Sequence, residues 1–289
     1  MRVFVIWLGL AVACFAVMPL PVVTAESSDA PETLVATADS ALQRGDLAGA
    51  IRASTQAIQH DPADFRGYFL RARAYDAMHD YPKAVADYTA ALKAKPNLPV
   101  AYQQRGMDHF RLGHISESIA DFDKFIEAVP SQAPEHWQRG ISLYYAGRFE
   151  DGRKQFELHQ TVNPSDVENA VWHFLCVARS VGPDKARAAL IPIEKDSRIP
   201  MMEVHRLFAG KAKPDDVLAA AREGAPPRDE LDKRLFYAHL YLGLYFEAVG
   251  NATAAREHIT KAATDFKADH YMGDVARVHA TLLKKTQKR

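Results

Sequence analysis

Four prolines recur at a constant spacing along the first part of the chain. They are Pro62, Pro96, Pro130 and Pro164, and each interval is 34 residues. A proline lacks a backbone N–H and clashes with the preceding helical turn, so each one is expected to end a helix. A fixed period of this length indicates a repeated unit of two helices. The sequence therefore divides into four units, at residues 31–64, 65–98, 99–132 and 133–166.

Other positions of the unit repeat with the prolines. The eighth position is small, with Ala38, Ala72, Gly106 and Gly140, as close packing of two helices requires. The fifteenth suits a turn between helices, with Gly45, His79, Gly113 and Gly147. The twentieth is again small, with Ala50, Ala84, Ser118 and Gly152, and the twenty-fourth is aromatic in three units, with Tyr88, Phe122 and Phe156. Period and residue types together resemble the tetratricopeptide-repeat (TPR) family. This resemblance implies an all-α TPR α-solenoid, a right-handed superhelix of helix hairpins that binds proteins and is not an enzyme.

Beyond residue 166 the repeat pattern weakens. We expect helices over residues 167–180 and 184–193, followed by short helices near 204–208 and 216–222 between prolines. A TPR-like pattern returns over 236–267, and 269–285 predicts a capping helix. The expected organisation is four TPR units within 26–166, a degenerate helical region over 167–235, and a C-terminal TPR-like unit with a capping helix over 236–289.

The N-terminus has the features of an export signal. Met1-Arg2 supplies a positive charge, and residues 3–23 contain no charged side chain. Val23-Thr24-Ala25 then offers the small residues of a cleavage site, which predicts a signal peptide over 1–25 and a periplasmic or secreted protein. Two alternatives stay open: an uncleaved membrane anchor over 3–23, and a lipoprotein modified at Cys14.

Composition and motifs argue against several functions. Lys plus Arg equals Asp plus Glu, at 36 each, so no basic excess points to nucleic acid. The twelve histidines are scattered, and no metal, phosphate-binding or nucleophile motif is found. We therefore predict no cofactor, no metal site and no catalytic residues. Cys176 lies in an apolar stretch and is expected to be a buried thiol.

In the TPR family, positions two, five, nine and twelve of each first helix face a concave groove. The resemblance therefore implies that a protein or peptide partner binds at Arg66, Phe69, Arg73, Gln103, Met107, Trp137 and Tyr144. Aromatic residues and arginine are the types most enriched at interface hot spots. Helix-spaced aromatics are also typical of a core, so a core role for Phe69, Trp137 and Tyr144 stays open.

Taken with the export signal, the architecture resembles exported bacterial envelope TPR adaptors of the NlpI type. That resemblance implies partners among cell-envelope enzymes. The alternative function is a membrane-anchored component of envelope assembly or secretion, held by the N-terminal segment.

Overall fold

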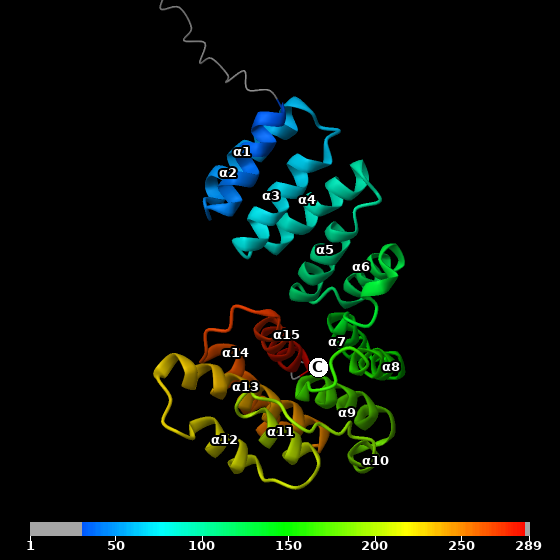
Figure 1. Ribbon diagram of the computed structural model, residues 1–289, viewed down its shortest axis with the longest axis vertical. Coiled ribbons are helices and arrows are strands. Elements are labelled where there is room, and N and C mark those ends of the chain that lie inside the picture. Colours follow the sequence, from blue (N-terminus) through cyan, green and yellow to red (C-terminus); the bar gives the residue numbers. More distant parts are fainter. Residues whose placement is uncertain (1–30, 287–289) are drawn as a thin grey trace, which may run out of the picture.

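The computed structural model describes residues 31–286, and the elements found within that range are all helices (Figure 1). The prediction of an all-α fold is confirmed. The expected signal peptide over 1–25, with the alternative lipid site Cys14, lies outside the described residues.

The first half of the structure is a stack of helix hairpins. Each hairpin consists of two consecutive helices: α1 Pro31–Gln43 with α2 Leu47–His60, α3 Phe65–Ala77 with α4 Tyr81–Ala94, α5 Pro99–Arg111 with α6 Ile115–Ala128, and α7 Trp137–Tyr145 with α8 Phe149–Gln160. Each turn passes through a residue with positive φ, at Gly45 (+74°), His79 (+60°), Gly113 (+75°) and Gly147 (+73°). The left-handed conformation explains why glycine recurs there, and His79 adopts it despite its side chain.

Small residues allow the two helices of a unit to approach. A Cβ added to Gly106 would lie 2.8 Å from the ring of Phe122, and one added to Gly140 would lie 2.7 Å from the ring of Phe156. Glycine at position eight is thus matched to the aromatic ring at position twenty-four.

The fourth unit starts later than the repeat predicts. A short 3₁₀ helix, η1 (Pro130–Gln132), and a turn precede α7, which begins only at Trp137. Pro134 is the second residue of unit four, which the 34-residue repeat places in the first helix of that unit. It lies instead in this turn, and its carbonyl oxygen is 2.9 Å from Nδ1 of His159. His136 caps α7 by accepting a hydrogen bond from the backbone N–H of Arg139 at 3.3 Å.

The second half is made of α9 Val167–Val181, α10 Pro183–Ala188, α11 Met201–Phe208, α12 Pro214–Arg222, α13 Arg228–Ala248, α14 Ala252–Thr264 and α15 Tyr271–Thr286. One expected boundary is wrong. The helix expected over 184–193 ends at Ala188, because Pro192 has no N–H to bond the Ala188 carbonyl and disfavours helical geometry at Ile191. Helix α13 begins at Arg228, before the expected start of the C-terminal TPR-like unit at 236; Arg228–Asp232 and Arg234–Glu230 ion pairs support its first turns.

The chain bends so that its C-terminal helix returns to the middle of the stack. In Figure 1, α15 lies inside the bend, next to α7 and α9 and below α5. A large buried cluster runs from α5 through α9 and α13 to α15 and includes Phe110, Trp172, Tyr241 and Val275. Cys176 belongs to it and is fully buried, as expected. Units one and two contribute only small separate clusters.

Candidate functional site

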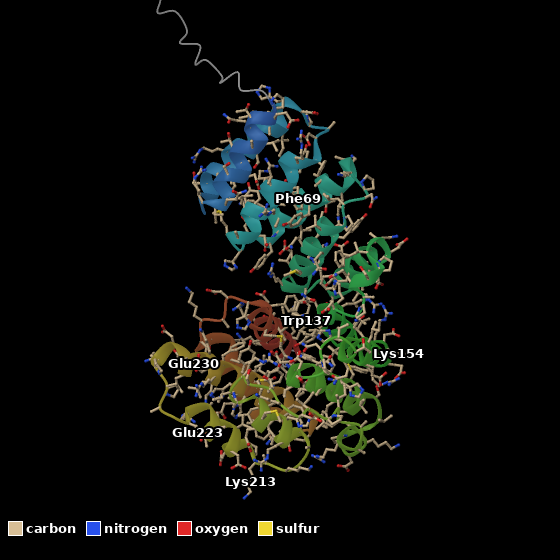
Figure 2. All side chains as sticks on the ribbon, viewed as in Figure 1. Phe69, Trp137, Lys154, Lys213, Glu223 and Glu230 are labelled. Atoms are coloured by element: carbon tan, nitrogen blue, oxygen red, sulfur yellow. The ribbon has the colours of Figure 1, made fainter. Side chains whose placement is uncertain are left out.

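The open part of the concave face lies over α1, α3 and α5. A cavity of about 550 Å³ is lined by Leu42, Leu47, Phe69, Arg73, Asp76, Ala77, Tyr88, Val100 and Gln104. A neighbouring hollow of about 300 Å³ is lined by Glu32, Val35, Ala36, Asp39, Arg66, Phe69 and Leu70. We call these two adjoining hollows the α1–α5 groove; Figure 2 labels Phe69, which lines both.

Phe69 and Arg73 are the main side chains of this groove that a partner could contact. The ring of Phe69 packs edge-on against buried Tyr88, with centroids 5.8 Å apart, so its position is fixed while part of its surface stays open. The side chain of Arg73 is 44% exposed, and within residues 31–286 its ion pairing is limited to a 3.5 Å contact with Asp39. Val100 adds an apolar surface that is 43% exposed. The groove therefore offers an aromatic ring, an aliphatic side chain and a loosely paired guanidinium.

Arg66, by contrast, is already engaged within the protein. Its guanidinium donates to both carboxylate oxygens of Glu32, at 2.7 and 2.6 Å, and to Asp64 at 2.8 Å. These hydrogen bonds lower the pKa of Asp64 below its usual value. A partner at Arg66 would have to displace a two-oxygen pair, so Arg73 is the more available cation.

The remaining predicted groove residues meet other parts of the protein. Gln103 accepts a hydrogen bond from Nε2 of His136 at 2.6 Å and joins α5 to the start of α7. Met107 packs on the large buried cluster. Tyr144 is only 5% exposed, among Tyr145, Phe149 and Trp172, so its expected place on an open groove is wrong.

Helix α15 covers the concave face of units three and four at Phe110 and Trp137, whereas Tyr144 is buried by side chains of α7, α8 and α9. Tyr271 of α15 stacks on Phe110 at a centroid distance of 5.2 Å and meets Trp137 edge-on at 5.2 Å. The hydroxyl of Tyr145 lies 2.9 Å from Nδ1 of His279. Trp137, labelled in Figure 2 at this junction, is therefore occupied by an intramolecular contact. The predicted groove of units two to four is open only over α1, α3 and α5.

One arginine ties the two halves together. Arg111 of α5 donates to Asp76 of α3 at 2.6 Å, to Asp108 of α5 at 2.7 Å and to Asp274 of α15 at 2.8 Å. Its side chain is 14% exposed, and that of Asp108 is fully buried. Burial, with the nearby Asp76 carboxylate, raises the pKa of Asp108 to about 8. The cluster gives α15 a fixed electrostatic contact on the inner face.

Several groove residues were not predicted from the repeat. Leu42 occupies position twelve of unit one, and that rule could have found it had it been applied to the first unit. Gln104 and Tyr88 are not at positions two, five, nine or twelve of a first helix. They line the groove because the hollow lies between the helices of neighbouring units and not directly over one helix.

Within 31–286, no group of three or more His, Cys, Asp or Glu side chains is arranged to hold a metal ion. Across the same residues, every helix falls short of the length or apolar character needed to cross a bilayer.

A curved stack of helix hairpins with a groove on its inner face defines a helical-repeat solenoid. Residues 35–99 match the family model described as tetratricopeptide repeat. Over these residues the chain contains tetratricopeptide repeats, as the 34-residue period predicted.

Solved structures agree on the fold. A tetratricopeptide repeat protein from Parabacteroides merdae is 16% identical with a TM-score of 0.58, covering 88% of this chain and 98% of its own. A MamA protein is 15% identical with a TM-score of 0.51, covering 63% of this chain and 92% of its own. A segment of MamA from Desulfovibrio magneticus RS-1 is 17% identical with a TM-score of 0.50, covering 55% and 89%. No curated protein sequence matches the chain.

Proposed function

We propose that this protein is an exported, non-catalytic scaffold that holds a partner protein in the α1–α5 groove. The observation that carries the proposal is the concave cavity of about 550 Å³, in which Phe69, Val100 and Arg73 line one surface. TPR repeats are generally protein-binding scaffolds, and a preformed groove of this kind suits an extended or helical peptide segment.

The groove lining suggests what such a segment carries. An apolar side chain would cover Phe69 and Val100, and a carboxylate would replace the weak 3.5 Å contact of Arg73 with Asp39. Charge-assisted pairing to arginine gives orientation as well as affinity. If the protein is exported, cell-envelope enzymes are the partners that its resemblance to NlpI-type adaptors favours.

Photo-crosslinking from a single position tests the groove. Val100 in the groove is 43% exposed, and Val162, after α8, is 44% exposed and is the matched control. A photoreactive residue at position 100, in the cells that make the protein, should give a discrete partner adduct that position 162 lacks. Adducts of equal yield at both positions would place binding elsewhere.

Once the crosslinked partner is purified, Arg73→Ala and Phe69→Ala should each weaken its binding to this protein by about 1–3 kcal/mol. Arg148→Ala is the control, because Arg148 lies on an exposed turn outside the groove and pairs with exposed Asp151. Wild-type affinity in both groove variants, with folding intact, would exclude the groove.

The export part of the proposal rests on the uncharged run over 3–23 and the small residues at 23–25. N-terminal sequencing of the protein from its native cells should begin at Glu26. An intact Met1 would favour instead the membrane-anchored assembly or secretion component, and a lipid-modified Cys14 would favour a lipoprotein.

A further inference from the structure

A second cavity lies in the C-terminal half, away from the α1–α5 groove. Its volume is about 320 Å³, and it is lined by Trp137, Ile141, Phe156, Asp166, Glu168, Asn169, Trp172, Arg198, Tyr237, His270, Tyr271 and Met272. These residues come from α7, α8, α9, α13, α15 and the loops before α9, α11 and α15. Arg198 and His270 are exposed at its rim. We call it the α9 pocket.

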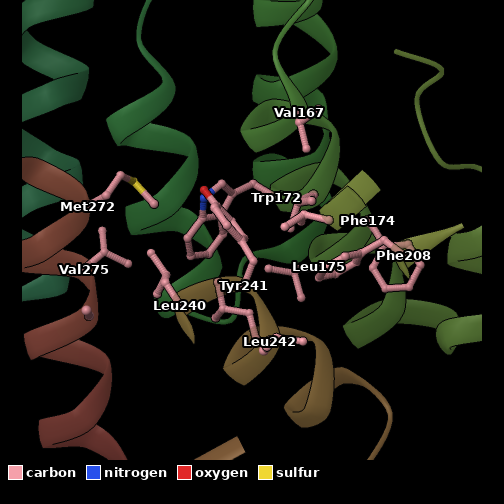
Figure 3. Close-up of a cluster of buried hydrophobic side chains, with 14 of the residues drawn as sticks. Val167, Trp172, Phe174, Leu175, Phe208, Leu240, Tyr241, Leu242, Met272 and Val275 are labelled. Carbon is pink, nitrogen blue, oxygen red and sulfur yellow. The ribbon is translucent and has the colours of Figure 1, made fainter. Parts of the chain in front are cut away.

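Aromatic rings form much of the wall of the α9 pocket. Tyr271 meets Trp137 edge-on at 5.2 Å, and Tyr237 stacks on His270 at 5.8 Å. Trp172 and Phe156 add two buried rings, 2% and 1% exposed. Figure 3 shows Met272 of α15 pointing toward Trp172 on α9, so the returning C-terminal helix supplies part of the wall.

The polar side of the pocket carries more negative than positive charge. A single guanidinium, that of Arg198, is shared by Asp166 at 2.6 Å, Glu168 at 2.5 Å and Asp196 at 2.5 Å. Glu168 also accepts a hydrogen bond from the hydroxyl of Tyr241. Two histidines lie nearby: His159, 4.0 Å from Asp166, and His270 on the pocket wall. Three carboxylates around one guanidinium leave an unbalanced charge beside the aromatic wall.

Three buried polar atoms on lining residues have no hydrogen-bond partner among the described residues: Oδ1 of Asn169, Nε1 of Trp172 and the hydroxyl of Tyr271. Asn169 is 3% exposed and donates its amide hydrogens to the carbonyl of Phe156 at 3.1 Å and to Gln160 at 3.0 Å. These bonds fix the amide orientation and leave Oδ1 as an unused acceptor. Nε1 of Trp172 is likewise an unused donor. Buried polar groups are almost always paired, so unpaired ones on a cavity wall indicate a site that a ligand completes.

We propose that the α9 pocket binds an organic cation, an ammonium or guanidinium group on a short apolar stem. Asp166 and Glu168 balance its charge, and the rings of Trp137, Tyr237 and Tyr271 enclose the stem. Cations are attracted to aromatic faces, and this attraction grows when the site excludes water. A volume near 320 Å³ suits one such side chain or small amine. The cation comes either from a basic side chain of a protein or from a free small molecule. The site is separate from the α1–α5 groove and does not depend on it.

The test compares two probes of the same shape and different charge. Of the three tryptophans of the chain, Trp137 and Trp172 line the pocket and Trp7 lies in the predicted signal peptide. In the full chain carrying Trp7→Phe, tryptophan fluorescence therefore reports on this pocket. Titration with n-butylguanidinium should give a saturable change, with an affinity at least tenfold above that of the neutral n-butylurea. Equal responses to the two probes would overturn the proposal.

Variants locate the binding. Glu168→Gln and Asp166→Asn should each weaken n-butylguanidinium binding about tenfold; asparagine keeps the helix cap that Asp166 makes with the backbone of Glu168. Glu203→Gln on α11 is the same change outside the pocket and should bind like wild type. Circular dichroism checks that each variant is folded. Unchanged affinity in both pocket variants would also overturn the proposal.

A last comparison separates the two sources of the cation. N-acetyl-arginine methylamide represents a free small molecule, and the peptide Gly-Gly-Arg-Gly-Gly represents a side chain presented by a protein. Binding of both supports a basic side chain of a partner, and binding of the first alone supports a small-molecule ligand. Failure of both, with n-butylguanidinium also inactive, would contradict the assignment.

Discussion

At the residue scale, glycine and aromatic pairs set the spacing of helices within a unit. The nearest ring atoms lie 2.8 Å from a Cβ built on Gly106 and 2.7 Å from one built on Gly140. Gly106→Leu or Gly140→Leu should therefore lower the free energy of unfolding by about 1–3 kcal/mol through overpacking. Urea denaturation measures this loss. Ala120→Leu, at an exposed position of α6, should cost far less; equal losses at buried and exposed positions would contradict the packing argument.

The buried carboxyl group of Glu168 should make the stability of the protein depend on pH. Burial raises its pKa to about 7, from the ordinary value of 4.5, despite its contact with Arg198. The carboxylates of Asp166 and Asp196 face the same guanidinium, and Tyr241 and Tyr237 complete the surroundings. Between these two pKa values the folded state holds a proton that the unfolded state has released, so folding is favoured more at low pH.

The contribution of Glu168 to stability should therefore be present below about pH 4.5 and be lost as the pH rises through about 7. The shift sets an upper limit of roughly 3 kcal/mol for this loss. Urea denaturation at pH 5 and pH 8 measures it in wild type and in Glu168→Gln. The pKa of Asp108 is also raised, and Asp108 contributes equally to the pH dependence of stability in both proteins. The difference in pH dependence between wild type and Glu168→Gln therefore comes from Glu168. If the free energy of unfolding changed equally between pH 5 and pH 8 in wild type and in Glu168→Gln, the raised pKa of Glu168 would be contradicted.

At the scale of elements, the local parts of the fold were predictable and the long-range contacts were not. The turn residues Gly45, Gly113 and Gly147 and the packing residue Gly140 each act within one hairpin, so a repeated residue type identifies them. The return of α15 joins Arg111 to Asp274, 163 positions apart, and no periodicity records such a contact. Phe69 and Arg73 line the open α1–α5 groove, whereas Trp137 packs on Tyr271 of α15 and Tyr144 is buried.

The Arg111 cluster makes the position of α15 testable. Arg111→Met removes the cation shared by Asp76, Asp108 and Asp274; Asp274 keeps its ion pair with Arg277, whereas buried Asp108 loses its cation. Breaking a buried ion pair from one side costs about 3–5 kcal/mol, and we expect a loss of that size in urea denaturation. Arg148→Met, which breaks an exposed pair with Asp151, should cost about 1 kcal/mol or less. Similar losses in the two variants would mean that Arg111 does not hold α15.

At the scale of the whole molecule, the apolar core is unevenly distributed. The cluster that includes Phe110, Trp172 and Val275 spans α5 to α15, whereas units one and two rest on small clusters around Leu70, Ala74 and Tyr88. In a solenoid each unit is stabilised mainly by its neighbours, so stability follows the local core. The α1–α5 groove therefore lies at the less stable end of the stack, where binding surfaces are commonly found.

This uneven core predicts that the protein does not unfold as one unit. Residues 31–98 should open first, because only neighbouring hairpins hold them, and residues 167–286 should open last. Hydrogen exchange read by mass spectrometry should give lower protection for peptides from α1–α4 than for peptides from α9, α13 and α15. The Arg111→Met variant should lower protection in α15 and leave α1 and α2 unchanged, since neither of these helices contacts the Arg111 cluster. Uniform protection along the chain would contradict this division, and it would mean that the ion pairs of α5 couple the two halves into a single cooperative unit.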